Sequence, residues 1–155
     1  MKRSTIVFLV IIFVIKNMQA FPQSGHGRQP PVFNHTALYV YDLEKSAMFY
    51  EKVMGIEKID DPFKDGKHVW FRIGQHSQLH VIKGAASVTQ HDISVHLSFS
   101  VGSLTDFMKH LDEMNVKYGN FNGDSKQPQT RPDGVHQIYF QDPDGYWIEI
   151  NDDKY

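Results

Sequence analysis

Residues 141–151 read QDPDGYWIEIN, a tight turn that runs into the last strand of the chain. Pro143 at the second position of the turn and Gly145 at the fourth are typical of a type I turn. Because successive side chains of a strand point to opposite faces, Glu149 is predicted on the face opposite Ile148. A carboxylate on such a half-buried strand needs a proton, a hydrogen-bonding partner or a cation.

The composition is that of one globular domain. The chain has 155 residues, of which 41% are hydrophobic and 22% charged, so it can bury a sizeable core. It contains no cysteine, which excludes disulfides, a thiolate metal site and a cysteine nucleophile. Nitrogen and oxygen ligands would therefore hold any metal ion.

Residues 1–20 are predicted to be a secretory signal peptide. Lys2 and Arg3 precede the apolar run 6–15, and the small residue Ala20 ends the segment. The run is too short to span a bilayer comfortably, although an uncleaved anchor is the alternative. The sequence thus predicts a secreted or periplasmic protein without stable membrane insertion once the signal is removed.

Residues 21–33 form a linker by composition. Without Lys2, Arg3 and Lys16, 13 basic residues remain against 18 acidic ones, so the mature chain carries a net charge of −5. This acidic balance argues against nucleic acid as a partner and leaves a small molecule as the expected one.

The rest of the chain contains one unit twice. Residues 35–40 form a predicted strand, Asp42 caps a helix over 43–53, and Gly55 ends that helix. Three further strands complete the unit, at 56–60, 68–73 and 78–83.

The second unit follows at an offset of 61 residues. It has a strand at 94–101 and a helix at 104–114 capped by Ser103, then a polar loop at 119–133 and the strand 135–141 before the final hairpin. Neither unit buries its sheet face alone, so the two are expected to pack together.

Four side chains that bind metals stand at matching places in the two units. His35 and His96 lie near the start of each first strand, and His80 and Glu149 lie within each last strand, all on the more polar face. A lone histidine in a sheet is usually structural, but four residues at equivalent positions favour a site for one divalent ion: Zn, Ni, Mn or Fe. The remaining histidines are predicted to lie on the surface.

Three segments carry a resemblance to a known family: HTALYVYDLEKSAMFYEKVMGI (35–56), SVHLSFSV (94–101) and YFQDPDGYWIEIND (139–152). With the repeat, they resemble the vicinal oxygen chelate superfamily, which includes glyoxalase I, fosfomycin-resistance proteins, methylmalonyl-CoA epimerase and extradiol dioxygenases. The resemblance implies an α+β fold in a single domain, 34–152. Its two βαβββ modules, 34–83 and 93–152, would form a curved, barrel-like mixed sheet around a metal cavity. It also implies a homodimer, whose metal site lies within one chain or is shared between two.

By position, His35, His96 and Glu149 match the metal ligands of the superfamily. His80 stands where glyoxalase I and the epimerases have Glu or Gln, a residue that binds metal and, in glyoxalase I, takes part in proton transfer. The resemblance therefore implies His80 and Glu149 as catalytic residues, with His80 acting as a fourth ligand or as a base.

Four residues are predicted to contact substrate. Tyr139 matches a tyrosine that contacts the antibiotic in fosfomycin transferases, but Ala37 replaces the substrate-binding Thr of those proteins and argues against that reaction. Trp70 would form an aromatic wall, with core packing as the alternative. Arg72 and Arg131 would bind an anionic group by forked contacts, with a solvated surface charge as the alternative.

The leading hypothesis is an exported metal-dependent enzyme, a glyoxalase-like lyase or isomerase acting on a small substrate with adjacent oxygens. Glutathione is chiefly cytosolic, which argues against glyoxalase I itself. An Fe(II) extradiol-type dioxygenase is the first alternative. The second is a non-catalytic protein that binds a small molecule or metal and confers resistance.

Overall fold

A computed structural model describes residues 29–154 of the chain. The predicted signal peptide, 1–20, and residues 21–28 of the predicted linker lie outside the described residues. Within 29–154, no helix has both the length and the apolar character needed to cross a membrane.

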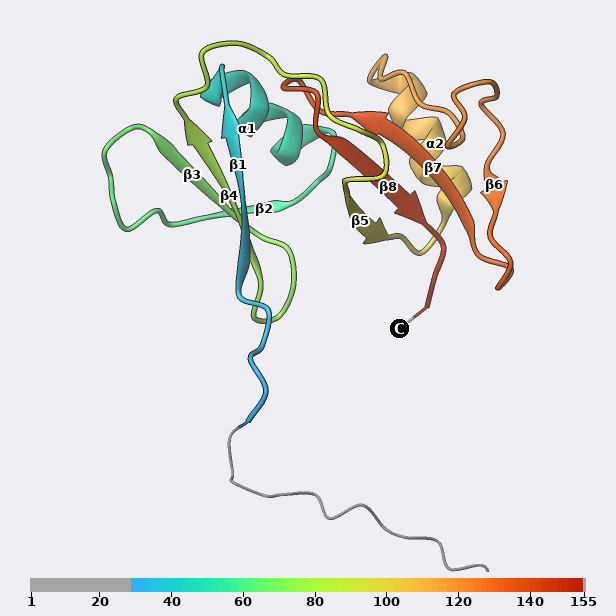
Figure 1. Ribbon diagram of the computed structural model, residues 1–155, viewed down its shortest axis with the longest axis horizontal. Coiled ribbons are helices and arrows are strands. Elements are labelled where there is room, and N and C mark those ends of the chain that lie inside the picture. The colour runs from blue at the N-terminus through green and yellow to red at the C-terminus, as the bar shows by residue number, and fades with distance from the viewer. Residues whose placement is uncertain (1–28, 155) are drawn as a thin grey trace, which may run out of the picture. The chain divides into compact units, whose positions relative to one another are not determined.

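The first module contains one helix and a four-stranded sheet (Figure 1). Its elements are β1 (His35–Val40), α1 (Leu43–Lys52), β2 (Glu57–Ile59), β3 (His68–Arg72) and β4 (Gln78–Lys83). The strand order is β1-β4-β3-β2, with β1 parallel to β4 and the other neighbours antiparallel. The helix packs against β3 and β4.

The second module repeats this topology. Its elements are β5 (His96–Ser100), α2 (Leu104–Glu113), β6 (Gln129–Thr130), β7 (His136–Gln141) and β8 (Trp147–Asn151). The order is β5-β8-β7-β6, and β5 runs parallel to β8. The α+β fold with two βαβββ modules is therefore confirmed, and within the described residues its two sheets stay separate and do not close into a barrel.

The helices begin where the sequence predicts, and each ends one residue before the predicted end. Asp42 accepts a hydrogen bond from the Lys45 amide at 3.1 Å, and Ser103 caps α2 in the same way. Gly55 and Asn115 follow the two helices with φ of 65° and 56°, the left-handed conformation that ends many helices. The two N-caps are 61 residues apart, as the repeat predicts, whereas Gly55 and Asn115 are 60 residues apart.

The apolar face of each sheet meets the helices, as the alternation of side chains predicts. On β1, Leu38 and Val40 are buried, whereas Tyr39 is 56% exposed. The opposite faces are called the open faces below. They carry His35, Tyr39, His68, Trp70, Arg72, Gln78 and His80 in the first module, and His96, Ser98, Ser100, Gln137, Tyr139, Trp147, Glu149 and Asn151 in the second.

The turn before β8 joins the two modules. The Gly145 amide donates to the Asp142 carbonyl at 3.1 Å, which closes the predicted turn. The Asp142 carboxylate accepts a hydrogen bond from the Tyr50 hydroxyl of α1 at 2.7 Å. The Asp144 carboxylate accepts one from the Ser46 hydroxyl, also on α1. Two buried carboxylates of the second module are thus satisfied by the helix of the first.

Asp142 should make the free energy of unfolding depend on pH. Burial raises the pKa of this carboxyl above its usual value and outweighs the hydrogen bond from Tyr50. The protonated Asp142 carboxyl therefore contributes to the free energy of unfolding. This contribution is fully present below the pKa of about 3.9 that the group has in the unfolded chain, and it is lost as pH rises through the higher pKa of the folded protein. Relative to Asp142→Asn, the wild-type protein should gain free energy of unfolding in urea as pH falls from 7 toward 4. Parallel pH profiles for the two proteins would contradict this.

Candidate metal centre

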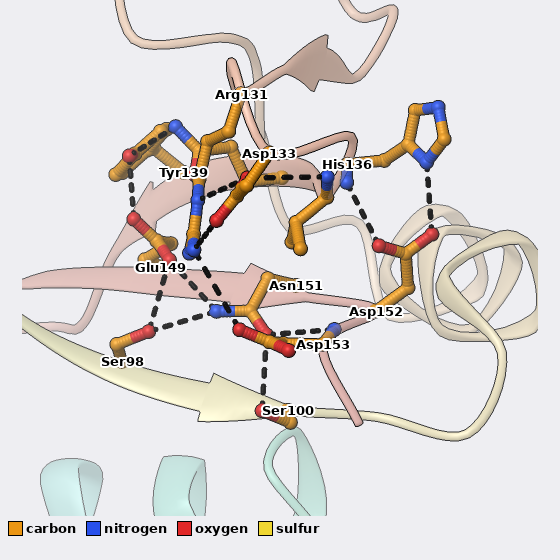
Figure 2. Close-up of polar contacts among 12 residues, drawn as sticks. Ser98, Ser100, Arg131, Asp133, His136, Tyr139, Glu149, Asn151, Asp152 and Asp153 are labelled. Atoms are coloured by element: carbon orange, nitrogen blue, oxygen red, sulfur yellow. Dashed lines mark hydrogen bonds and ion pairs between the residues drawn. The ribbon is translucent and has the colours of Figure 1, made fainter. Parts of the chain in front are cut away.

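Glu149 lies at the centre of a hydrogen-bond network on the open face of the second module (Figure 2). The Tyr139 hydroxyl on β7 donates to Glu149 Oε2 at 2.6 Å. Ser98 on β5 and Asn151 on β8 donate to Oε1 at 3.0 and 2.8 Å. Tyr139 and Ser98 are the register partners of Glu149 on the two neighbouring strands, so strand pairing itself places these donors.

This network holds Glu149 in its ionised form. Burial would raise the pKa of the Glu149 carboxyl, but the hydrogen bonds from Tyr139, Asn151 and Ser98 and the nearby His96 outweigh burial and lower the pKa. Burial, together with Glu149, raises the pKa of the Tyr139 hydroxyl well above its ordinary value. At neutral pH, Tyr139 is therefore a donor and Glu149 an acceptor.

His96 faces this carboxylate with a ring nitrogen that carries a lone pair when the ring is neutral. Its Nδ1 lies 2.8 Å from the Ile93 carbonyl, which can only accept, so Nδ1 carries a proton. The other nitrogen, Nε2, lies 3.3 Å from Glu149 Oε2. Two lone pairs repel each other, so the contact requires a proton on Nε2 or a metal cation bound to both atoms.

The geometry of the pair suits a metal cation. Two ligand atoms of a tetrahedral zinc ion, each about 2.1 Å from the metal, lie about 3.4 Å apart. A histidine that donates its second N–H to a backbone carbonyl is also the usual arrangement of a metal ligand. His96 and Glu149 therefore fit half of a divalent metal site.

His35 and His80 form the second pair, on the open face of the first module. Their rings are stacked with centroids 4.3 Å apart and planes at 12°. The Trp70 indole stacks on the other face of His80, with centroids 3.8 Å apart, because Trp70 is the register partner of His80 on β3. Burial lowers the pKa of the His80 imidazole, and the neighbouring His35 lowers it further. His80 is thus a neutral imidazole at neutral pH.

The stack restricts which ring can move. Two parallel stacked rings cannot direct their in-plane lone pairs at one ion, so one ring must turn before both can bind it. His80 is covered by Trp70, and its Nε2 lies 2.9 Å from Gln78 Oε1. His35 is exposed and is the ring with room to turn.

Within residues 29–154, the four predicted ligands occur as two pairs and not as one cluster. The only set of three or more metal-binding side chains whose ligand atoms all lie within 4.8 Å of one another in this part of the chain is Asp61, Asp65 and His68. The Asp61 oxygens accept backbone hydrogen bonds, and Asp65 lies 2.9 Å from His68 Nδ1. These hydrogen bonds within the turn explain why the three side chains lie close together. His68, predicted to be a surface residue, is only partly exposed.

Two of the four predicted substrate residues contact the ligand pairs, and the other two form ion pairs with carboxylates. Trp70 and Tyr139 contact the two ligand pairs directly. Arg72 instead forms an ion pair with Glu57 at 2.9 Å, and Arg131 pairs with Asp133. Ser98 was not among the predicted site residues, although strand alternation from His96 indicates that it shares the open face.

Tyr139→Phe tests the network around Glu149. The variant removes one hydrogen bond to the carboxylate and leaves the aromatic ring, so we expect metal affinity to fall roughly 10- to 100-fold. Competition with a chromogenic chelator measures this affinity. Tyr118→Phe, which also removes a hydroxyl donor to a carboxylate, is the matched control because its partner Asp112 is exposed. Equal affinity in Tyr139→Phe and wild-type protein would show that the hydroxyl does not position Glu149.

The chain belongs to the Glyoxalase/Bleomycin resistance protein/Dioxygenase superfamily, because the model of that family matches residues 32–150. The uncharacterized protein YwbC of Bacillus subtilis is 29% identical over 127 residues, which cover 76% of this chain and 94% of YwbC. The lactoylglutathione lyase of Pseudomonas putida is 24% identical over 151 residues, covering 77% of this chain and 83% of that enzyme.

The solved structures give the same fold. The crystal structure of the fosfomycin resistance protein FosX from Listeria monocytogenes matches with a TM-score of 0.62 at 20% identity, over 79% of this chain and 93% of FosX. A likeness at this identity shows the fold, while the reaction has to be argued from the site.

Proposed function

We propose that the protein is a metal-dependent lyase or isomerase that acts on a small substrate with two adjacent oxygens. The contact between His96 Nε2 and Glu149 Oε2 carries this proposal, because its 3.3 Å separation and the proton on His96 Nδ1 suit a shared divalent cation. His35 and His80 would complete a set of three imidazoles and one carboxylate, suited to zinc, nickel or ferrous iron. When bound, such a cation supplies Lewis-acid stabilisation of negative charge on the substrate oxygens.

His80 is the candidate base in the alternative arrangement in which it does not bind the metal, because a ring nitrogen whose lone pair binds a cation cannot accept a proton. Its low pKa leaves the imidazole neutral, so it can take a proton from the carbon beside a substrate carbonyl and return it to the adjacent carbon. Trp70 holds the plane of the His80 ring during this transfer. Glu149 and its three hydrogen-bond donors keep a fixed negative charge at the opposite side of the site.

We also propose that two chains share each metal site. Within the described residues, His35 and His80 belong to one pair, and His96 and Glu149 to another. Among residues 29–154, no helix covers either open face, and Tyr39 exposes a large aromatic surface on the first of them. In a homodimer, the first pair of one subunit would meet the second pair of its partner.

A mixed dimer tests this arrangement. One chain carries His35→Ala and His80→Ala, and the other carries His96→Ala and Glu149→Ala. Sharing would leave one intact site in each heterodimer, so we expect half the metal content of the wild-type dimer, measured by elemental analysis, and none in either homodimer. A heterodimer without metal would show that each site lies within one chain.

A ferrous dioxygenase is the second candidate. The stack with Trp70 and the contact with Gln78 hold His80 in place, and without His80 the site reduces to His35, His96 and Glu149. Two histidines and one carboxylate are the ligand set of non-haem iron oxygenases. Oxygen uptake with a catechol under ferrous iron would favour this candidate over the lyase.

A further inference from the structure

The edge of the His80 ring is the part of it that can reach a ligand. Trp70 and His35 stack on its two faces, with ring centroids 3.8 and 4.3 Å away. Both stacks are nearly parallel, at 9° and 12°, so the flanking rings fix the plane of the imidazole. The lone pair of a neutral imidazole lies in that plane, on one of the two ring nitrogens. His80 can therefore bind an ion only through Nδ1 or Nε2.

One of these two nitrogens already has a partner. His80 Nε2 lies 2.9 Å from Oε1 of Gln78, which is two residues earlier on β4. An amide oxygen only accepts hydrogen bonds, so Nε2 carries the proton of this contact. A neutral imidazole has a single N–H proton, and burial keeps His80 neutral by lowering its pKa. The lone pair of His80 is then on Nδ1.

Nδ1 of His80 remains accessible. Among residues 29–154, Trp70 Nε1 and Gln137 Oε1 are the only enclosed side-chain nitrogen or oxygen atoms without a hydrogen-bond partner. His80 Nδ1 makes no hydrogen bond in this part of the chain either, so it retains contact with solvent. A cation can reach this atom without breaking a hydrogen bond of the protein.

Strand pairing holds Gln78 beside His80. Gln78 is the register partner of His35 on β1 and of Arg72 on β3, so it lies on the open face of the first module. Its backbone amide donates to the Asn34 carbonyl at 3.0 Å, and its side chain is partly buried. Residues two apart on a strand share a face, so the backbone of β4 itself directs Gln78 and His80 to the same side.

We propose that Gln78 is a positioning residue that makes Nδ1 the metal-binding nitrogen of His80. His96 has the opposite arrangement, because its Nδ1 donates to the Ile93 carbonyl and its Nε2 faces Glu149. The site would thus combine Nδ1 of one histidine with Nε2 of another. This inference rests on the proposed metal-dependent function and assigns a role to a residue outside the four ligands.

Nuclear magnetic resonance of the metal-free full chain tests the first step, because nitrogen chemical shifts show which ring nitrogen is protonated. At a pH of about 9, above the ordinary pKa of histidine, the ring is neutral in every variant. We expect His80 to be protonated on Nε2 in the wild-type protein and in Gln78→Glu, whose carboxylate can accept the same hydrogen bond. In Gln78→Leu, the ring should divide between the two tautomers.

Gln75→Leu is the matched control, because Gln75 is an exposed glutamine in the connection between β3 and β4. It should leave the tautomer of His80 unchanged. Protonation of Nδ1 in the wild-type protein would overturn the proposal. Identical nitrogen shifts in Gln78→Leu and wild-type protein would overturn it as well, since Gln78 would then not set the tautomer.

Cadmium binding tests the second step, because coupling between a spin-active cadmium isotope and a ring nitrogen identifies the ligand atom. We expect coupling to His80 Nδ1 and His96 Nε2. Cadmium affinity should fall roughly 10- to 100-fold in Gln78→Leu and recover in Gln78→Glu. Coupling to His80 Nε2, or bound cadmium without coupling to His80, would overturn the assignment of Nδ1. A wild-type protein that binds no cation would refute the proposed function and the ligand assignment with it, whereas the tautomer measurement does not depend on metal.

Discussion

His96→Ala should remove the metal ion and leave the domain folded. His96 donates from Nδ1 to the Ile93 carbonyl and presents Nε2 to Glu149, so the alanine variant loses one ligand of the pair outright. Its ring is only partly buried, and the surrounding core does not depend on it. Elemental analysis of protein purified without chelators or an added histidine tag should fall from about one ion per site to none.

His76→Ala is the matched control, because His76 is an exposed histidine in the connection between β3 and β4. It should keep its full metal content. Circular dichroism should show the same secondary structure in both variants. Full metal occupancy in His96→Ala would overturn the metal centre.

Asp144→Ala should destabilise the protein more than any exposed substitution. Asp144 is 3% exposed and accepts hydrogen bonds from the Ser46 hydroxyl and, at 2.6 Å, from the Tyr41 amide. The alanine variant leaves the Tyr41 amide and the Ser46 hydroxyl without their acceptor, and Ser46 is buried in the interior. We expect the free energy of unfolding to fall by about 3 kcal/mol, since each unsatisfied buried group costs roughly 1–3 kcal/mol.

Urea unfolding measures this loss, and Asp60→Ala provides the control. Asp60 is an exposed aspartate between β2 and the following turn, so its replacement should change stability by no more than about 0.5 kcal/mol. Similar losses in the two variants would show that the turn before β8 does not hold the modules together.

The two modules could be predicted from the sequence because helix caps and strand alternation depend on residues that are close together in the chain. Caps such as Asp42 and Ser103 act within one turn of the helix they start, and strand alternation separates His35 from Leu38 without knowledge of partners. The strand β6 was missed because Gln129 and Thr130 are two exposed polar residues without a pattern.

The site was predictable only up to the face on which each residue lies. Stacking of Trp70 on His80 depends on the register between β3 and β4, which alternation leaves open. Arg131 pairs locally with Asp133, but its second contact, with Asp153, joins residues 22 positions apart in the chain and depends on tertiary packing. The division of the ligands into two pairs is likewise a matter of tertiary packing, beyond any motif.

The stack of Trp70, His80 and His35 should also give the ring protons of His80 a distinct chemical shift in nuclear magnetic resonance. Ring currents shield protons that lie above or below an aromatic plane, and His80 has a ring on each side. Its carbon-bound ring protons should therefore resonate upfield of those of the other histidines. If His35 turns to bind an ion, the shielding from that side disappears, so the His80 resonance reports directly on the arrangement of the stack.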